Sequence, residues 1–264
     1  MTAPARTDQA PALKDVMRLV LLAGKVLVES GANASRSEET IMRLGLSCGA
    51  DTVDVYCTLT GFFVTVVRGD EVLTRVVSMR SHGTDLGRIA EVQEMSMALE
   101  RGSTTCDATI NQLKAMILNE ASVGYSPRVR LLGSAVSCGA FAVLLGGGPA
   151  DFIPALLAGL FAQVVCSKIR RTSPEFVAIF FSVMIGTLGA VVASRLGLGS
   201  LRYITVGVIM PMVPGLAVTN SVRDLIFGDL LSGLSRWAEA LLSAAAIAGG
   251  VYAVLAAFRV DLWI

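Results

Sequence analysis

The residues best suited to chemistry follow a pair of prolines late in the chain. Pro211 and Pro214 stand three apart, with Gly215 behind them, inside an apolar stretch. Each proline removes a backbone donor and crowds the preceding turn, so a helix that contains both is expected to break there. Polar side chains come directly after the break: Asn220, Arg223, Asp224 and Asp229. A guanidinium near a free helix N-terminus suits a carboxylate-bearing solute, because both favour an anion.

The segments around these residues are unusually apolar. Mean hydropathy is +0.66, and 16% of residues are charged, against about 25% in soluble proteins. Residues 129–264 hold only 15 of the 43 charged residues. The sequence therefore predicts a charged domain over 1–128 fused to a transmembrane domain over 129–264. Since crossing a bilayer takes about 20 helical residues, the expected spans are 131–148, 152–167, 176–194, 203–222 and 240–258.

The prolines fall inside the fourth expected span. A broken helix is tolerated at membrane depth only where protein or water covers the freed backbone groups. Transporters use such breaks to aim helix ends at a substrate. The predicted substrate path therefore consists of the proline break and the polar residues after it. The alternative is a structural kink followed by an ordinary interfacial charge cluster.

Basic residues beside the spans predict the orientation. With the first domain in the cytoplasm, seven basic residues flank the spans inside and three outside. Because basic flanks favour the cytoplasm, the expected localisation is a bacterial inner membrane with a cytoplasmic N-terminal domain and an outside C-terminus. The inside set is Arg128, Arg130, Lys168, Arg170, Arg171, Arg223 and Arg236; the outside set is Arg195, Arg202 and Arg259.

The first domain has an α+β pattern. Apolar positions recur at helical spacing from Val16 to Leu27, and Gly31 is placed to end that helix. The period then changes to two over 53–59, 62–68 and 72–78, which predicts an antiparallel three-stranded meander. Two more helices are expected near 85–99 and 104–120. The predicted fold is thus helices flanking a small sheet, joined to a five-helix membrane domain.

Few residues of the first domain suggest a binding site. Ser35 to Glu38 has the form of a capping box, which favours a capping role for Glu38. Arg36 and Glu39 could form a ligand or gating contact, or Arg36 could be solvated while Glu39 pairs with Arg43 on the next turn. His82 lies in a Ser-His-Gly loop, which is a weak hydrolase signal because triad members usually come from distant segments.

Composition argues against several other classes. The net charge of +1 gives no reason to expect nucleic-acid binding. The five cysteines are scattered and odd in number, so they are predicted to be free thiols rather than a disulfide framework or zinc site. No metal or cofactor site is expected. Small residues four apart predict close helix packing, within the bundle or against a partner. They are Ala135/Gly139, Gly186/Ala190 and Ala245/Gly249/Ala253.

Several motifs stand in an order that resembles the threonine/serine exporter family. The first is Ser30-Gly31-Ala32 followed by Arg36 and Glu38. The later ones are Pro211-x-x-Pro214-Gly215, Asn220, Arg223-Asp224, Gly228-Asp229, Ser232-Gly233 and Arg236. The resemblance covers nearly the whole chain, from about residue 16 to 258. It marks Gly31, Arg36 and Glu39 as a motif of the first domain, without assigning their roles.

The resemblance implies a non-enzymatic exporter of small amino acids or dicarboxylates. Single-chain members continue into a second set of spans, whereas this chain resembles the larger half of a split form. That implies a separate smaller membrane subunit, although a second copy of this chain could supply the missing half. The alternative is a membrane-anchored sensor or enzyme whose soluble domain binds a small ligand.

Overall fold

A computed structural model describes residues 11–79, 83–118, 126–170 and 172–260. Its contacts divide the chain into two compact units. The first joins residues 1–124 to Asn220–Arg236, and the second joins residues 125–219 to residues 237–264. The first unit therefore contains a segment from the apolar half of the sequence. His82 lies outside the described residues.

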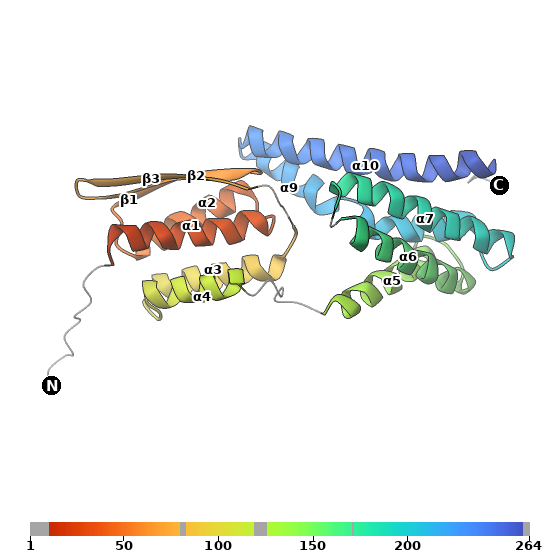
Figure 1. Ribbon diagram of the computed structural model, residues 1–264, viewed down its shortest axis with the longest axis horizontal. Coiled ribbons are helices and arrows are strands. Elements are labelled where there is room, and N and C mark those ends of the chain that lie inside the picture. The colour runs from red at the N-terminus through yellow and green to blue at the C-terminus, as the bar shows by residue number, and fades with distance from the viewer. Residues whose placement is uncertain (1–10, 80–82, 119–125, 171, 261–264) are drawn as a thin grey trace. The chain divides into compact units, whose positions relative to one another are not determined.

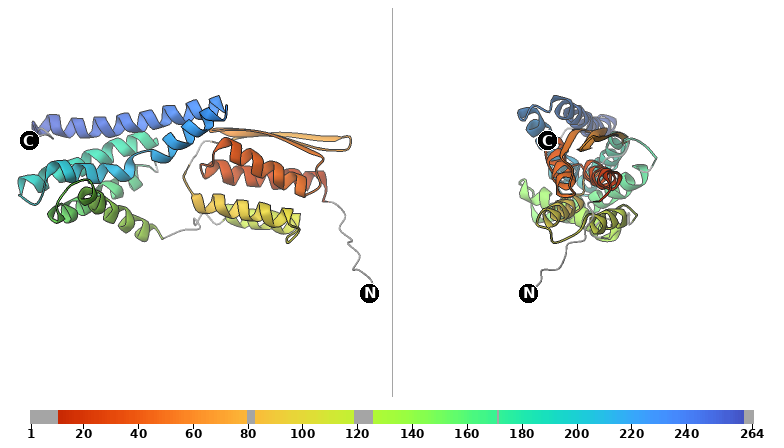
Figure 2. Two further views of the ribbon diagram at one scale, coloured as in Figure 1. Left: turned by 180° about the vertical axis from the view of Figure 1, so that it is seen from behind. Right: turned by 90° about the vertical axis from the view of Figure 1, so that its left-hand side faces the viewer.

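The first unit stacks a sheet and two layers of helices (Figures 1 and 2). The three-stranded sheet packs on α1 and α2, which in turn pack on α3 and α4. The elements of residues 1–124 are α1 (Leu13–Glu29), α2 (Ala34–Ser47), β1 (Thr52–Thr58), β2 (Gly61–Arg68), β3 (Glu71–Ser78), α3 (Leu86–Glu100) and α4 (Cys106–Leu118).

The α1 helix forms because its apolar residues follow the helical period. Val16, Leu19, Val20 and Leu27 are fully buried. The helix ends at Gly31, whose φ of +78° suits glycine. The amide of Gly31 donates to the Val28 carbonyl, and that of Ala32 donates to the Leu27 carbonyl. These two bonds form a Schellman motif and confirm the predicted helix end.

The predicted meander is confirmed. Its strand order is β1-β2-β3, and both pairs are antiparallel. Alternation places Cys57 and Phe62 in the core. The opposite face exposes Tyr56, Phe63 and Val76, which share one register row. The sheet is therefore covered by helices on one side, as period-two sequences predict.

The expected capping box is wrong. Asn33 caps α2, and its side chain accepts from the Arg36 amide at 3.0 Å. Glu38 lies one turn inside the helix and instead accepts a hydrogen bond from the backbone amide of Cys57 at 2.7 Å. Asparagine is as good an N-cap as serine, so the helix starts two residues earlier than the motif suggested. Glu38 is thereby released for a tertiary contact.

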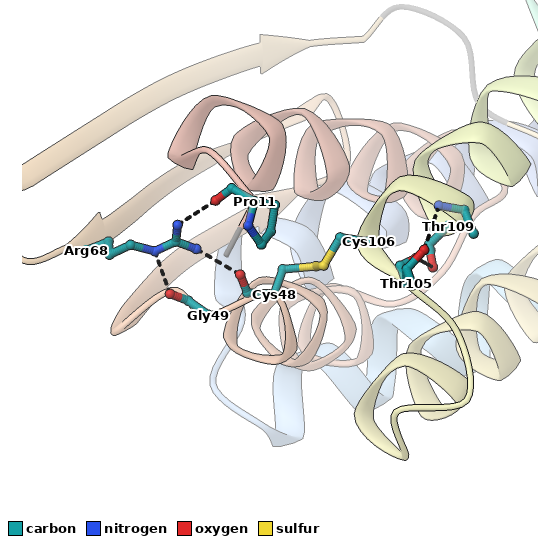
Figure 3. Close-up of a disulfide and its surroundings, with 8 residues drawn as sticks. Pro11, Cys48, Gly49, Arg68, Thr105, Cys106 and Thr109 are labelled. Atoms are coloured by element: carbon teal, nitrogen blue, oxygen red, sulfur yellow. Dashed lines mark hydrogen bonds between the residues drawn. A yellow bond between two sulfur atoms is a disulfide. The ribbon is translucent and has the colours of Figure 1, made fainter. Parts of the chain in front are cut away.

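The prediction that all cysteines are free thiols is also wrong. Cys48 and Cys106 form a disulfide with Cα atoms 6.0 Å apart, across 58 residues of sequence (Figure 3). The pairing joins the end of α2 to the start of α4, a contact that sequence spacing could not reveal. Beside it, the Arg68 guanidinium donates to the carbonyls of Pro11, Cys48 and Gly49. The end of α2 is therefore held by covalent and polar contacts.

The second unit is a helical bundle. In Figure 1, α10 lies along α7, and a Cβ atom at Gly250 would meet the Phe180 carbonyl at 2.8 Å. The elements are α5 (Pro127–Leu144), α6 (Pro149–Ile169), α7 (Glu175–Arg195), α8 (Leu201–Ile209) and the 3₁₀ turn η1 (Met210–Met212). Two further helices, α9 (Gly215–Ile226) and α10 (Leu230–Phe258), run through both units.

Small residues make this bundle tight. A Cβ atom at Gly186 would lie 2.3 Å from Val208, and one at Gly159 would lie 2.4 Å from the Cys138 sulfur. A Cβ atom at Gly249 would meet the Phe180 ring at 3.4 Å. The small-residue positions of α7 and α10 thus bring helices of this chain together. These positions therefore already contact other helices of the same bundle.

Three helices are long and apolar enough to cross a membrane: α6, α7 and α10. A fourth crossing arises if α8–η1 and α9 count as one broken span. The expected span 131–148 corresponds to α5, which begins earlier and carries Arg128 and Arg130 in its first turn. By length and composition, the described residues therefore provide three to four spans rather than the expected five.

Candidate functional site

The fourth apolar segment is broken where the prolines stand. The helix of Leu201–Met212 and the helix of Gly215–Ile226 meet at an angle of 50°. Pro211 lies in η1, and Pro214 precedes the first residue of α9. Val213 between them has an extended backbone with ψ of 127°. This confirms the predicted discontinuity, which follows from the missing amide of each proline.

Asp224 is the most deeply buried charge after the break. Its side chain is 1% exposed, and its carboxylate lies 3.2 Å from Nε of Arg236, which is 10% exposed. Arg236 also donates from Nη2 to the carbonyl of Ala32 at 2.5 Å. The N-terminal turn of α2 faces the same carboxylate through the amide of Ala34, and a helix N-terminus favours an anion. Both side chains belong to the first unit.

Glu38 brings a second carboxylate to this region. Its partner Cys57 has its amide bonded to Glu38 and its carbonyl bonded to the Ser232 hydroxyl at 3.2 Å. Burial raises the pKa of Glu38, and the charges of Asp229 and Asp224 raise it further, while the Cys57 amide opposes the shift. We call Glu38, Asp224, Asp229 and Arg236 the carboxylate cluster. The cluster unites residues almost 200 positions apart in the sequence.

The segment Asn220–Arg236, the hairpin segment, has its own internal bonds. The Ser221 hydroxyl donates to the Gly233 carbonyl at 2.7 Å, and the Asp229 amide donates to the Asp224 carbonyl at 2.9 Å. A Cβ atom at Gly233 would lie 2.7 Å from the Leu225 side chain. The close approach of α9 to α10 at this point therefore requires glycine. These bonds hold Asp224, Asp229 and Arg236 in one short unit.

Gly31 shapes the corner between α1 and α2. A Cβ atom there would lie 2.6 Å from the Gly83 carbonyl, and the Gly83 amide donates to the Glu29 carbonyl at 2.9 Å. The corner places the carbonyl of Ala32 where Arg236 binds it. Gly31 thus supports the site through the backbone conformation of this corner.

Arg36 and Glu39 lie outside the cluster. The Arg36 guanidinium donates to the Gln93 side chain on α3. Glu39 pairs with Arg43 at 2.6 Å, as expected for residues one turn apart. Arg43 also lies 3.7 Å from Glu100. These polar contacts join α2 to α3 at the surface, and they support the structural interpretation of Arg36 and Glu39.

The predicted site residues therefore do not all lie together: some belong to the carboxylate cluster and others lie outside it. Asp224 and Asp229 join the cluster, whereas Arg223 is exposed on α9 and Asn220 is partly buried. Pro211, Pro214 and Gly215 belong to the second unit. Sequence reasoning named the acidic residues, but it gave Glu38 a capping role and omitted Arg236 from the site. The resemblance motifs already contained both residues, so a signal for them existed.

Asp151 is a buried charge that sequence reasoning missed. Its carboxylate accepts from the amide of Gly148 at 2.8 Å and from that of Ser200 at 2.6 Å. It thereby ties the start of α6 to the start of α8 in the second unit. Its position in the first turn of an apolar helix, after three glycines, was the available signal.

An apolar hollow of about 610 Å³ lies between α6 and α7. Ile153, Leu157, Phe161, Leu188 and Val192 are among the residues that line it. The lining contains no charged side chain, so a carboxylate would lose its solvation there without a compensating partner. The hollow suits an acyl chain or an apolar side chain, and it is a poor substrate site.

Comparison with known proteins identifies the family. The family described as "Putative threonine/serine exporter" matches residues 18–258. The chain is 22% identical to the probable succinate transporter subunits YjjP of Klebsiella aerogenes and Escherichia coli K12, covering 94% of this chain and 96% and 97% of those proteins. It is 26% identical to the threonine/serine exporter of Corynebacterium glutamicum over 89% of this chain, but over only 50% of that protein.

No solved structure matches the chain. The lengths of the relatives fall into two groups. This chain spans nearly all of the YjjP proteins and about half of the Corynebacterium exporter. The match includes both the motif that follows α1 and the hairpin segment that meets it. The chain therefore belongs to the threonine/serine exporter family, a family of membrane exporters and not of enzymes.

Proposed function

We propose that the chain is a subunit of an inner-membrane secondary exporter for small carboxylate-bearing metabolites such as threonine, serine or succinate. The observation that carries the proposal is the broken helix at Pro211–Gly215, within a chain of an exporter family. An anchor for a soluble sensor has no need of such a break. The names of the relatives support this range of substrates.

The proposed substrate path runs along the broken span and the polar residues after it. It includes Pro211, Pro214, Gly215, Asn220 and Arg223, with Asp224 and Asp229 beyond them. Arg223 is the candidate carboxylate reader because it is exposed on α9 and its planar fork can hold both oxygens. Arg236 is less suited to that role because Asp224 and the Ala32 carbonyl already bind it.

We further propose that α5 completes a five-helix membrane domain. Leu132 and Leu144 on α5 are 59% and 76% exposed, which suits contact with lipid. Its inner face packs on α6, where a Cβ atom at Gly139 would lie 2.8 Å from the Phe152 carbonyl. The two arginines in its first turn are then interfacial and can extend to the headgroups.

A second membrane component is also proposed, either a smaller subunit or a second copy of this chain. Support comes from the word "subunit" in the YjjP names and from the half-length match to the Corynebacterium exporter. Many transporters pair two structural repeats around a midplane site. The spans of this chain correspond to one such repeat and would surround only half of the site.

The proposed orientation places residues 1–128 in the cytoplasm and the C-terminus in the periplasm. The basic bias beside the spans supports it. The Cys48–Cys106 disulfide is the observation against it, because cytosolic thiols are normally kept reduced. The basic bias involves ten residues and the disulfide one pair, so the bias decides the proposed orientation.

Cysteine labelling tests the orientation. Single cysteines at Gly148 and Ser173 lie at the two ends of α6, and a side chain at Gly148 meets no atom closer than 4.0 Å. In a cysteine-free chain, an impermeant maleimide added outside should label Gly148→Cys and spare Ser173→Cys. The reverse pattern would place the first unit in the periplasm.

Export from cells tests the function. Cells that lack the endogenous exporter and are loaded with threonine, serine or succinate should release at least one of them faster with this chain and its partner than without. The Arg223→Lys variant keeps the charge but loses the fork, so it should insert normally and export less. Unchanged release of all three solutes would reject this substrate class.

A further inference from the structure

The carboxylate cluster has more negative than positive groups. Glu38 on α2 has two charged neighbours, Asp224 on α9 and Asp229 between α9 and α10. The Arg236 guanidinium pairs with Asp224. Asp224 is 1% exposed, and Glu38 is partly buried. Like charges in a shared, poorly solvated site cannot all ionise without cost. The arrangement therefore favours an additional cation among the carboxylates.

The same cluster holds the hairpin segment to the rest of the first unit. Arg236 binds the Ala32 carbonyl, and the Ser232 hydroxyl binds the Cys57 carbonyl. Glu38 binds the amide of that same Cys57. Glu38 therefore lies where the hairpin segment meets β1. Any change in its charge acts directly on this contact.

We propose that Glu38, beside Asp224 and Asp229, is a proton-binding site whose occupancy controls the docking of the hairpin segment onto α1, α2 and β1. With the proton bound, the segment is docked. When the proton leaves, repulsion among three carboxylates weakens the contact and releases the segment. The inference rests on the proposed function only for its consequence: α9 starts at the proline break, so docking restrains one end of the substrate path.

The direction of the pH effect follows from the groups around Glu38. They are Cys57 on β1, Asp224 on α9 and Asp229 in the loop, with Arg236 on α10 paired to Asp224. Burial raises the Cys57 pKa, so its thiol stays neutral. Burial and the two carboxylates raise the Glu38 pKa from 4.5. Docking is therefore fully stabilised below pH 4.5 and loses stability as the pH rises through the raised pKa.

Hydrogen exchange of the full-length chain in detergent tests the site. EDTA is present, so that no divalent cation supplies the missing charge. After correction for the intrinsic exchange rate, protection of residues 220–236 in the wild type should fall as the pH rises above 4.5 and through the raised pKa of Glu38. Glu38→Gln resembles the protonated acid and can keep the bond to the Cys57 amide. It should stay protected at every pH.

Glu39→Gln is the matched control. Glu39 is the next residue on α2 and pairs with Arg43 at the surface, so this variant should keep the pH dependence of the wild type. Identical profiles for the two glutamine variants would overturn the proposal, as would a wild-type profile without pH dependence.

A second variant protects the test against misfolding of Glu38→Gln. Asp229→Asn removes one charge that raises the Glu38 pKa, so the pKa of Glu38 should fall in this variant. The proposal therefore requires the loss of protection in Asp229→Asn to occur at lower pH than in the wild type, and an unmoved transition would contradict it. Exchange is measured without solute, so a failed export assay leaves this result standing, and a flat exchange profile leaves the export proposal untouched.

Discussion

At the scale of single residues, the ion pair of Asp224 and Arg236 is the most deeply buried ion pair found among the described residues of the first unit. The two side chains come from helices that continue into the second unit, yet they lie against the α1–α2 corner at low exposure. Burying two charges is costly unless each finds its partner. The ion pair therefore gives no reason to expect high stability. Removing either member, however, leaves the other charge buried without a partner.

Removing one member should reveal this dependence. Arg236→Met leaves Asp224 buried without its partner and should destabilise the first unit by about 3–5 kcal/mol. The double variant Asp224→Leu/Arg236→Met should recover most of the loss, because no charge is then stranded. Exchange protection of the α1 and α2 amides measures the change in free energy.

Arg223→Met serves as the control for that series. Arg223 is exposed on the same helix, so its loss should change stability by less than about 0.5 kcal/mol. A double variant that is no more stable than Arg236→Met would show that the ion pair is not what the arginine contributes. An effect of Arg223→Met equal to that of Arg236→Met would point to a general effect of charge.

At the scale of elements, the broken span links sequence to proposed function most directly. Pro211→Ala/Pro214→Ala restores two backbone donors and should straighten the segment from α8 to α9. Export should then fall, while the amount of folded protein stays close to that of the wild type. Release assays and size-exclusion chromatography measure the two effects. Full export by the double variant would show that the break has no role in transport.

Helix packing in the second unit gives a sharper stability test. A Cβ atom at Gly159 would lie 2.4 Å from the Cys138 sulfur, while one at Gly133 meets no atom within 4 Å. Gly159→Ala should therefore destabilise the bundle by about 1–3 kcal/mol through overpacking. Gly133→Ala should be neutral or stabilising by up to about 1 kcal/mol, because alanine favours the helix.

Thermal unfolding of both glycine variants in the same detergent compares them directly. Equal midpoints for Gly159→Ala and Gly133→Ala would mean that α5 and α6 do not approach as closely as described. The result also bears on assembly. If Gly159, Gly186 and Gly249 all pack within the chain, a partner must bind elsewhere.

Much of the fold follows from periodicity in the sequence. The α1 stripe, the meander and the proline break arise from local rules of spacing and backbone chemistry. Two contacts join distant segments: the disulfide between Cys48 and Cys106, and the hydrogen bond from the Cys57 amide to Glu38. Local rules of spacing do not predict such pairs. For the same reason, the sequence pointed to only some members of the carboxylate cluster. Acidic residues stood out after the break, but their partner Arg236 looked like a topology signal.

At the scale of the whole molecule, the chain combines two units that share two helices. The helices α9 and α10 carry residues of both units, so the hairpin segment at their junction is well placed to transmit changes along the chain. Asp224 and Asp229 of the proposed proton site lie in that segment, and Glu38 on α2 lies where the segment docks. Substrate release and proton binding would then be linked through one helix, α9, whose other end is the proline break.

Flux through purified protein tests the central claim most directly. The chain is reconstituted into liposomes alone and together with a candidate for the proposed smaller membrane subunit, and the vesicles are loaded with labelled threonine, serine or succinate. The account predicts rapid efflux of at least one solute from vesicles that hold both proteins, and little efflux when the chain carries Pro211→Ala/Pro214→Ala. Efflux from vesicles with the chain alone distinguishes the two proposed partners: it should be small if a smaller subunit is required and rapid if a second copy of the chain supplies the missing half. Absence of efflux of every solute from vesicles that hold both folded proteins would contradict it.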